Sequence, residues 1–355
     1  MINSGIKVIA LIIILQSFSG CLDLNSVLAG LGLAPDPQIE YVLDHNSILV
    51  SSDTKLYKAY NSQDSYKGYP IQIAEIDMTT KQLTNTFGTG QFGYDDGMSG
   101  ANEGAVATFN EIEAMVFLPG PPNRLLIGDY CLLREINLST TAVTTLAGSN
   151  STCSDLDGTG TSAQFNRIVG LAVSGTTLFV ATSTQVKRVD LNSYTVTSFA
   201  GSNTAGDLDG VGTLAAIQPM RMTIIENNLY ILDANSKIKR ISIVDGTVTT
   251  LAGQAGLGSN GSVDGNGTAA TFNFSNTHHL TSDGLGFIFW TEEQKIRKMN
   301  IFTQEVKTII DSSNMREDIN SSSSLGQAKV FNPSGILFSN QGLYISNEWG
   351  IRLIK

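Results

Sequence analysis

Residues Asp155–Asn166 read DLDGTGTSAQFN, and two close variants follow: DLDGVGTLAAIQ from Asp207 and SVDGNGTAATFN from Ser262. A looser copy, YDDGMSGANEGAVATFN, begins at Tyr94. Recurrence of one segment along a chain indicates an architecture that uses the same structural unit several times. Either this loop binds an ion, as Asp-x-Asp-Gly strings often do, or it is a turn that every unit needs.

Three short apolar strips recur in a fixed order around these loops. Examples are LYILD at Leu229, IKRI at Ile238 and VTTLAG at Val248. Each strip is rich in β-branched or aromatic residues and is bounded by Gly, Asn, Asp or Ser, which is typical of a strand. Copies of the second strip begin at Ile73, Leu133, Val186, Ile238, Ile296 and Ile351, at steps of 60, 53, 52, 58 and 55 residues.

A fourth strand precedes the first strip of each unit, as in VGLAV (169–173) and GILF (335–338). Helical periodicity of convincing length is absent from the sequence. Six units of four antiparallel strands predict an all-β fold, a six-bladed β-propeller with four-stranded blades. A single blade cannot cover its own faces, so each blade is expected to pack on its neighbours.

The sixth unit ends at Lys355 after three strands. We expect an N-terminal strand within SVLAGLG (26–32) to complete this blade and close the ring, because Gly30 precedes Gly88 by 58 residues, a step that fits the repeat. Such a strand would remove an exposed sheet edge. The alternative is that this segment is a loose tether.

The N-terminus has the pattern of an export signal. Lys7 precedes the apolar run VIALIIIL (8–15), which is shorter than the roughly 20 residues needed to span a bilayer. Ser19-Gly20-Cys21 resembles the lipobox of bacterial lipoproteins, although Phe18 stands where Leu is usual. This resemblance implies lipidation of Cys21, with secretion and a free cysteine as the alternative.

The predicted organisation is a signal peptide at 1–20, a lipid-anchored N-terminus at 21–40 and a propeller at 41–355. We therefore expect an exported protein anchored to a bacterial membrane. The outer membrane, on its periplasmic or its surface side, is favoured because Leu22 rather than Asp follows Cys21.

Charge excludes one class of partner. The chain has 22 Lys and Arg against 32 Asp and Glu, a net charge of −10. A chain this acidic repels phosphate backbones, so we expect no nucleic-acid partner. The pairs Lys187-Arg188, Lys239-Arg240 and Arg297-Lys298 recur once per unit, and we interpret them as structural side chains paired with acidic residues.

The unit D-G-x-G-x-x-A-x-F-N, an apolar strand, LYIxD, IKRI and VTTLAG resembles the NHL repeat. The match extends from about Tyr41 to Lys355, is strongest for 155–265, and lacks the Asp-Gly loop in the first unit. This resemblance implies a six-bladed propeller of the kind that commonly binds partners. Some NHL proteins bind RNA, which the acidic charge and the export signal disfavour here.

The Asp-Gly loop itself is predicted to be a turn. A calcium loop needs six to eight oxygens, usually including a bidentate Glu, whereas Asp155 and Asp157 supply two carboxylates with no Glu nearby. These two residues remain the only candidate metal ligands in the loop. The glycines expected to adopt angles unfavourable for other residues are Gly158, Gly210 and Gly265.

In a four-stranded blade, the loop between the second and third strands and the loop between blades emerge on one face, which we call the loop face. In the first unit the first strip, ILVSS at Ile48, begins 25 residues before the second, against 8 or 9 residues in the other units. Tyrosines in this insertion are candidate binding residues, with a packed flap as the alternative. They are Tyr57, Tyr60, Tyr66 and Tyr69.

Cys131 and Cys153 are both expected on the loop face. Outside the cytoplasm two nearby cysteines often pair, so a structural disulfide is favoured over two separate thiols.

Polar residues near the starts of the innermost strands are predicted to surround the central channel. They are Glu113, Arg167, Arg221, His278 and His279. The resemblance implies that this place can hold a catalytic metal, as in the amidating lyases of the NHL group and the gluconolactonase-like hydrolases. One His pair is too small a ligand set, and the two arginines oppose a cation.

The sequence therefore favours a non-enzymatic module, without cofactor, that binds a protein or glycan through its loop face. The alternative is a metal-dependent lyase or lactonase-like hydrolase with its site in the central channel.

Overall fold

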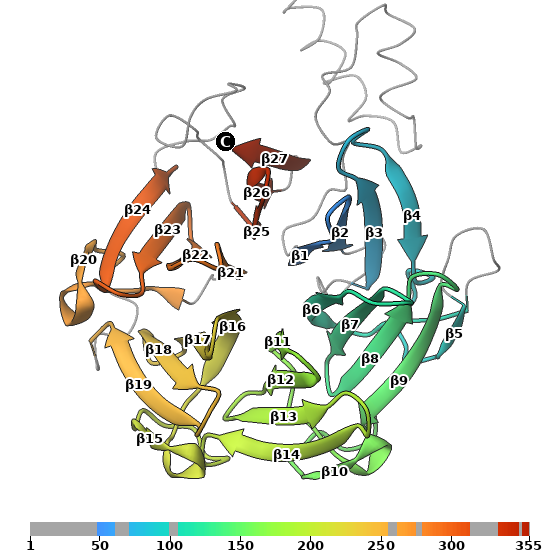
Figure 1. Cartoon of the computed structure of the whole chain (residues 1–355), viewed down its shortest axis with the longest axis horizontal. Coiled ribbons are helices and arrows are strands. Elements are labelled where there is room, and N and C mark those ends of the chain that lie inside the picture. Colours follow the sequence, from blue (N-terminus) through green and yellow to red (C-terminus); the bar gives the residue numbers. More distant parts are fainter. Residues whose placement is uncertain are drawn as a thin grey trace, which may run out of the picture. The chain divides into compact units, whose positions relative to one another are not determined.

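The computed structural model describes residues 48–60, 71–98, 106–254, 261–274, 279–312, 333–347 and 350–354. Contacts divide the chain into two units, Met1–Gln38 and Ile39–Lys355, and every described residue belongs to the second. The strands of this second unit form six antiparallel sheets arranged around a centre (Figure 1). The fold is therefore a six-bladed β-propeller, as the repeat predicts.

The blades follow one another along the chain. The first contains β1 (Ile48–Ser51), β2 (Lys55–Tyr60), β3 (Gln72–Asp77) and β4 (Leu83–Phe87). The second contains β5 (Gly97–Met98), β6 (Ile112–Leu118), β7 (Arg124–Asp129), β8 (Leu132–Asn137) and β9 (Ala142–Gly148). The third contains β10 (Gly158–Thr159), β11 (Gly170–Ser174), β12 (Thr177–Ala181), β13 (Val186–Asp190) and β14 (Thr195–Ala200).

The remaining blades repeat this order. The fourth contains β15 (Gly210–Val211), β16 (Pro219–Ile225), β17 (Asn228–Asp233), β18 (Lys237–Ser242) and β19 (Thr247–Ala252). The fifth contains β20 (Gly265–Asn266), β21 (Leu280–Ser282), β22 (Phe287–Glu292), β23 (Lys295–Asn300) and β24 (Glu305–Asp311). The sixth contains β25 (Gly335–Ser339), β26 (Gly342–Asn347) and β27 (Gly350–Ile354). Short 3-10 helices, η1 (Gly160–Ser162), η2 (Gly212–Leu214) and η3 (Gly267–Ala269), follow β10, β15 and β20.

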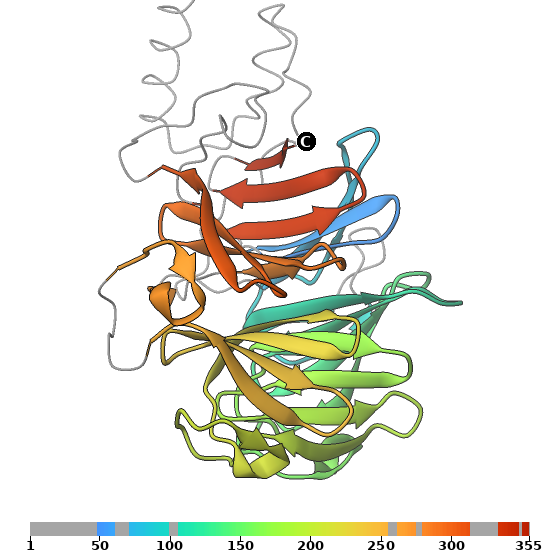
Figure 2. The same cartoon turned by 60° about the vertical axis from the view of Figure 1, so that its left-hand side comes forward.

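The innermost strands close the ring. Strands β1, β6, β11, β16, β21 and β25 each lie against the next, and β25 lies against β1. Seen from the side, the strands of each sheet run side by side and successive sheets lie face to face (Figure 2). The closing strand predicted at 26–32, the signal peptide and Cys21 lie outside the described residues, and the described part of the sixth blade has three strands.

The hydrophobic core consists of layers between neighbouring blades. Phe165, which is fully buried, packs between Leu133 of the second blade and Leu178 of the third. At the point where the two ends of the ring meet, Leu56 of the first blade shares a cluster with Tyr344 of the sixth. Because each blade buries its faces on both neighbours, the core of a blade forms only when the ring is assembled.

The Asp-Gly loop adds a short fifth strand to four of the blades. Strand β10 pairs with β14, the outermost strand of the blade that follows the loop, in the register Gly158↔Val196 and Thr159↔Thr195. Strands β5, β15 and β20 make the same kind of pair with β9, β19 and β24. The predicted four strands are present in these blades, and the loop extends each sheet by one short strand.

The glycine prediction for this loop is wrong in its position. The left-handed residues are Gly160, Gly212 and Gly267, with φ of 57°, 57° and 55°, which come two positions after Gly158, Gly210 and Gly265. The first glycine of each loop is required instead because the backbone of the following 3-10 turn lies too close to leave room for a side chain. A Cβ on Gly158 would lie 2.9 Å from the backbone nitrogen of Ala163, well inside van der Waals contact.

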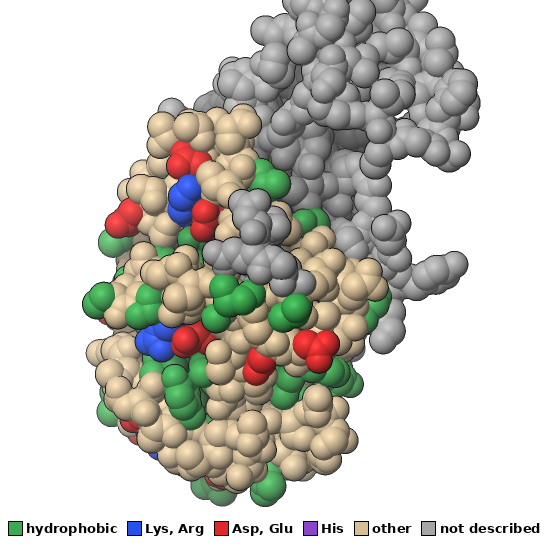
Figure 3. Space-filling model, turned by 90° about the vertical axis from the view of Figure 1, so that its right-hand side faces the viewer, with side chains coloured by type: hydrophobic (Ala, Val, Ile, Leu, Met, Phe, Trp, Pro, Cys, Tyr) green, Lys and Arg blue, Asp and Glu red, His purple; other side chains and the backbone are tan. Residues whose placement is uncertain are grey.

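On the face seen in Figure 3, charged side chains are interspersed rather than gathered by sign. In the view of Figure 3, basic side chains lie beside acidic ones among neutral residues.

The repeated aspartate of the loop holds a cation of the third strand and a hydroxyl of the fourth. In the third blade, Asp157 accepts hydrogen bonds from Lys187 Nζ at 2.8 Å and from Ser198 Oγ at 2.9 Å. We call this three-residue contact the loop clamp. Its copies are Asp96–Arg134–Thr145, Asp157–Lys187–Ser198, Asp209–Lys239–Thr250 and Asp264–Arg297–Thr308.

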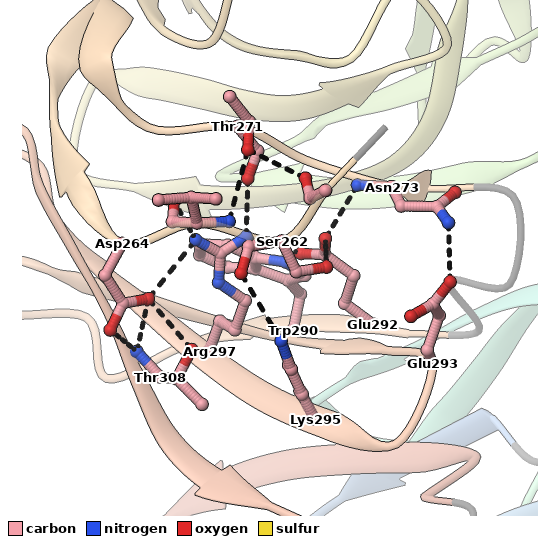
Figure 4. A network of polar contacts seen from close by, with 12 residues as sticks. Ser262, Asp264, Thr271, Asn273, Trp290, Glu292, Glu293, Lys295, Arg297 and Thr308 are labelled. Carbon is pink, nitrogen blue, oxygen red and sulfur yellow. Dashed lines mark hydrogen bonds and ion pairs between the residues drawn. The ribbon is translucent and has the colours of Figure 1, made fainter. Parts of the chain in front are cut away.

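Figure 4 shows the polar contacts around Arg297, the cation of the clamp in the fifth blade. Arg297 has a fully buried side chain that donates to Glu292 at 2.9 Å, to Asp264 at 3.3 Å and to the carbonyl oxygen of Thr271 at 2.8 Å. Trp290 Nε1 also donates to Glu292, at 2.9 Å.

The clamp cations, Lys187, Lys239 and Arg297 among them, are therefore scaffold residues paired with acidic groups, as predicted. Arg188 and Lys298, the second members of their pairs, lie over the rings of Phe199 and Phe287.

Candidate functional site

The tyrosine-rich segment is placed differently from the prediction. Ile48–Ser51 is the innermost strand β1, and Lys55–Tyr60 is the second strand β2 rather than a loop. Tyr57 is 3% exposed and stacks on Phe117 with ring centroids 6.3 Å apart, and Tyr60 is half-buried. The structure thus corrects the expectation that Tyr57 is an exposed binding residue. Tyr66 and Tyr69 lie outside the described residues.

The channel candidates come together at one end of the central channel. Glu113 is the second residue of β6 and Arg221 the third of β16, whereas Arg167 lies three residues before β11 and His279 directly precedes β21. All four therefore lie near the start of an innermost strand. His278 lies outside the described residues.

Arg167 joins the second and third blades. Its Nε donates to Glu113 Oε2 at 2.9 Å, its Nη2 donates to Glu111 Oε1 at 2.7 Å, and Nη2 also contacts Glu113 Oε1. The side chain is 41% exposed, and the residue has φ of 56°. A non-glycine residue in this left-handed region costs about 1–2 kcal/mol, so the ion pairs hold Arg167 in a conformation it does not favour.

Glu111 is the site residue that the sequence interpretation missed. The pKa of Glu111 is raised from the ordinary value of 4.5 to about 7, because burial and then the neighbouring carboxyl of Glu113 raise it more than Arg167 lowers it. Glu111 therefore gains or loses its proton near neutral pH. The available signal was the motif NEIEA, which places two glutamates two residues apart where an innermost strand begins.

Arg221 and His279 complete this cluster from the fourth and fifth blades. Arg221 Nη1 donates to the carbonyl oxygen of Met220 at 2.6 Å, and burial lowers the pKa of the guanidinium, with the charge of Glu113 opposing. His279 Nδ1 is hydrogen-bonded to the carbonyl oxygen of Ile336. Burial lowers the pKa of His279 to about 4, so the ring is neutral at pH 7. We call Glu111, Glu113, Arg167, Arg221 and His279 the channel-end cluster.

Below this cluster, the channel contains a cavity of about 340 Å³. Residues of the innermost strands of all six blades line it, and Glu113, Arg221 and His279 are among them. Apolar side chains such as Met115, Val173 and Leu337 make up most of the remaining wall. At the ends of these strands, Phe117 and Pro119 also line a more polar hollow of about 590 Å³ between hairpin turns.

A disulfide braces the loop face beside the cluster. Cys131 and Cys153 are bonded with their Cα atoms 5.6 Å apart. The adjacent residue, Tyr130, donates its backbone N–H to the carbonyl of Glu111 at 2.8 Å and accepts the N–H of Ile168 at 2.7 Å. The disulfide-bonded turn therefore sits between the two segments that carry Glu111 and Arg167.

The candidate metal ligands are engaged in the scaffold. Asp155 accepts from the backbone N–H of Asn166 at 3.1 Å and from Thr182 Oγ1 at 3.0 Å, and Asp157 belongs to a loop clamp. Within the described residues, no group of three or more His, Cys, Asp or Glu side chains could hold a metal ion. None of the helices in the same part of the chain is long and apolar enough to cross a bilayer.

No family model and no curated protein matches this chain. Among solved structures, the extracellular domain assigned to a hybrid two-component system of Bacteroides thetaiotaomicron is 14% identical over 87% of this chain, with a TM-score of 0.50. The match covers 39% of that chain, so this protein spans about two fifths of its length. An auxiliary nutrient binding protein of the same organism is 14% identical over 83% of this chain and 81% of its own, with a TM-score of 0.43. The likeness shows the propeller fold alone.

Proposed function

We propose that this chain is an exported, non-enzymatic binding module of the NHL type that holds a protein or glycan partner on its loop face. Lipidation of Cys21 anchors it to a bacterial membrane, with the outer membrane favoured. The partner contacts the region around Arg167 and the Cys131–Cys153 turn. Tyr66 and Tyr69 belong to the same proposal as further contact residues.

The observation that carries this proposal is the conformation of Arg167. The side chain is 41% exposed, its backbone is left-handed, and two carboxylates and a disulfide-braced turn hold it there. Strain that is retained by several surrounding contacts is characteristic of binding and catalytic positions. A partly exposed guanidinium fixed in this way is a ready contact for a polar partner, since little side-chain entropy remains to be lost.

Export has support from two independent features. The apolar run at 8–15 followed by Ser19-Gly20-Cys21 has the order of a lipoprotein signal. The Cys131–Cys153 disulfide is typical of proteins that mature in an oxidising compartment. The alternative of a metal-dependent lyase or lactonase gains no ligand set from the described residues.

The loop-face proposal is tested with the purified full chain and envelope extract of the producing bacterium. We expect a retained protein or glycan component that is lost at least tenfold in Arg167→Glu and kept in Arg188→Glu. Arg188 is an exposed arginine on β13, outside the loop face, and it stacks on Phe199. If both variants retain the envelope component equally well, the proposal is contradicted. It is also contradicted if the wild-type chain retains no component reproducibly.

The anchor is tested separately. Cys21→Ser should move the protein from the membrane fraction to the soluble extracytoplasmic fraction, because a diacylated cysteine is then unavailable. Unchanged membrane association of this variant would remove the lipid from the proposal and leave loop-face binding as an independent question.

A further inference from the structure

Three hairpin turns line one hollow at the face of the propeller opposite the loop face. They join β1 to β2, β6 to β7 and β25 to β26, in the first, second and sixth blades. The hollow, which we call the hairpin hollow, measures about 590 Å³, within the range of about 300–1,000 Å³ that is typical of small-molecule sites. Its lining consists of Ser51, Ser52, Asp53, Thr54, Phe117, Pro119, Asn123, Ser339 and Asn340.

The polar groups of the hairpin hollow are almost all uncharged. Asp53 is the one acidic residue among the described residues that line it, and none of them is basic. The remaining polar groups are hydroxyls and side-chain amides, which both donate and accept hydrogen bonds, whereas a carboxylate only accepts. A lining of this kind matches a molecule that carries several neutral hydroxyl groups.

Three of these polar side chains are available to a ligand. Within the described part of the chain, the side chains of Asp53, Thr54 and Asn340 take part in no hydrogen bond or ion pair, and all three residues are exposed. They come from the turns of the first and sixth blades, which adjoin where the ring closes. A bound molecule would therefore compete only with water for these groups.

Hydrogen bonds inside the turns hold the shape of the hollow. Ser52 Oγ accepts the backbone N–H of Lys55 at 3.0 Å, and Asn123 Oδ1 accepts that of Gly120 at 3.0 Å. Pro119 has a φ fixed by its ring. Because these turns are ordered before a ligand arrives, less conformational entropy is lost on binding.

Phe117 gives the hollow an apolar surface. This residue is half-buried, and its ring stacks on the buried ring of Tyr57 with the two planes 12° apart. The face of an aromatic ring carries partial negative charge, which attracts C–H groups. A pyranose ring has hydroxyl groups around its edge and C–H groups on its faces, so one sugar can use both kinds of surface. A purely apolar ligand would instead remove water from the polar groups without replacing its hydrogen bonds.

We propose that the hairpin hollow binds a neutral oligosaccharide. The hydroxyl groups of one sugar ring bind Asp53, Thr54 and Asn340, and a C–H face of the same ring lies against Phe117. An acidic glycan is disfavoured, because Asp53 repels it and no described basic residue of the lining attracts it. The attraction of a single exposed carboxylate for an amine in water is weak. The hairpin hollow and Arg167 lie on opposite faces, so this site does not depend on the loop-face contact.

The experiment uses the full chain and sugars of equal length. Maltotriose, cellotriose and triacetylchitotriose are neutral, and deacetylated chitotriose is a cation at pH 6. Saturation-transfer NMR and titration calorimetry at pH 6 should show saturable binding of at least one neutral trisaccharide, with the largest transfer to ring C–H protons. Absence of saturable binding for all three neutral sugars would overturn the proposal. Tighter binding of deacetylated chitotriose than of its acetylated parent would overturn it in favour of an amine site.

Substitutions at exposed positions locate the site without disturbing the fold. Asp53→Ala should weaken the bound sugar at least tenfold, and Asn340→Ala should weaken it at least threefold. The matched control is Glu226→Ala, which removes an exposed carboxylate from the turn between β16 and β17, outside the hollow, and should leave the affinity unchanged. Arg167→Glu should also leave it unchanged, so that loss of loop-face binding and loss of sugar binding are distinguishable. Equal sugar affinity in Asp53→Ala and Glu226→Ala would place the sugar outside the hollow and overturn the proposal.

Discussion

The loop clamps and the channel-end cluster are both built from Arg, Lys, Asp and Glu, yet they differ in how often they occur. The clamp recurs in the second, third, fourth and fifth blades with a cation that is 0–1% exposed and an aspartate that is 41–49% exposed. The channel-end cluster takes two glutamates from the second blade, one arginine each from the third and fourth and a histidine from the fifth, and it occurs once among the described residues. Its arginines and glutamates stand where sister blades have other side chains, such as Gly170 at the start of β11.

The number of copies distinguishes residues that the fold requires, such as the loop clamps, from residues that it can accommodate, such as the channel-end cluster. A residue needed to attach each Asp-Gly loop to its blade must return with every repeat, because every blade has the same edge to cover. A residue that appears in one blade alone is not needed to build a blade. Its presence at the end of a ligand-sized cavity, with a strained backbone at Arg167, is better explained by binding.

The largest effect is expected from breaking a clamp. Arg297→Met removes the charged partner of Glu292, whose side chain is fully buried, and leaves that carboxyl in the interior with neutral donors, namely Trp290, the Ser262 hydroxyl and the backbone N–H of Asn273. Loss of one partner of a buried pair costs about 3–5 kcal/mol. Urea unfolding should therefore show a large fall in the midpoint.

The matched control for Arg297 is its neighbour on β23. Lys298 lies over the ring of Phe287 at 4.9 Å, outside the clamp, and Lys298→Met should cost about 1 kcal/mol or less. Similar costs for the two variants would mean that clamp cations do not differ from other third-strand cations.

The disulfide should give the next largest effect. It joins cysteines 22 residues apart at one blade junction. Like the channel-end cluster, it is therefore a feature that the other blades do not repeat in the described part of the chain. Closing a loop of this length stabilises a protein by about 3 kcal/mol in the chain-entropy view. The double variant Cys131→Ala and Cys153→Ala should lose about that much free energy of unfolding. Reductant should produce a comparable loss in wild type and none in the double variant, and an unchanged wild-type midpoint under reduction would contradict this assignment.

The sequence repeat predicted the six-bladed architecture, but it did not predict the features in which single blades differ from the repeat. Strips that return every 52–60 residues report burial between blades, which is the same for every copy, so the blade number and the clamp cations could be inferred. The first blade misled the assignment because ILVSS at Ile48 has the apolar character of a second strand. KLYKAY at 55–60 carries a lysine at every third position and so lacks the period-two alternation that indicates a strand, although it forms β2.

The site was predictable in outline only. The positions of Glu113, Arg167, Arg221 and His279 near strand starts indicated a channel, since innermost strands share one direction. Glu111 was missed because its role depends on a left-handed turn at Arg167, and a single sequence does not reveal a positive φ at a non-glycine residue. The cavity likewise depends on how far six strands stand apart, which side-chain packing decides.

The pH dependence of stability offers a smaller test of the cluster. Because the pKa of Glu111 is about 7 in the folded chain and 4.5 ordinarily, the folded state binds more protons between these values. The free energy of unfolding therefore falls as pH rises from about 4.5 to about 7 through this group. Glu111→Gln removes that slope, so wild type should lose stability relative to the variant between pH 5 and pH 8.

Measuring this difference between variants avoids a competing effect. His279, with a pKa lowered to about 4, is neutral in the fold and contributes a slope of the opposite sign between about 4 and 6.5, which is common to wild type and variant. Glu135→Gln, which removes a carboxylate paired with Arg124 at 2.9 Å, serves as the matched control and should run parallel to wild type. A Glu111→Gln profile parallel to wild type would show that Glu111 does not titrate near neutral pH.

The smallest expected effect is the most informative for this comparison, because it concerns a half-buried arginine that the fold should not need. Arg221→Met loses the attraction of Glu113 but relieves the cost of keeping a guanidinium in the channel, whereas Arg297→Met only breaks a pair. Replacing a buried charge by an apolar side chain of similar volume is often neutral or stabilising. The free energy of unfolding should therefore change by less than about 1 kcal/mol, measured beside Arg297→Met under the same conditions. A loss of unfolding free energy as large as that of Arg297→Met would assign Arg221 to the scaffold. The channel-end cluster would then have a structural role, like the four loop clamps.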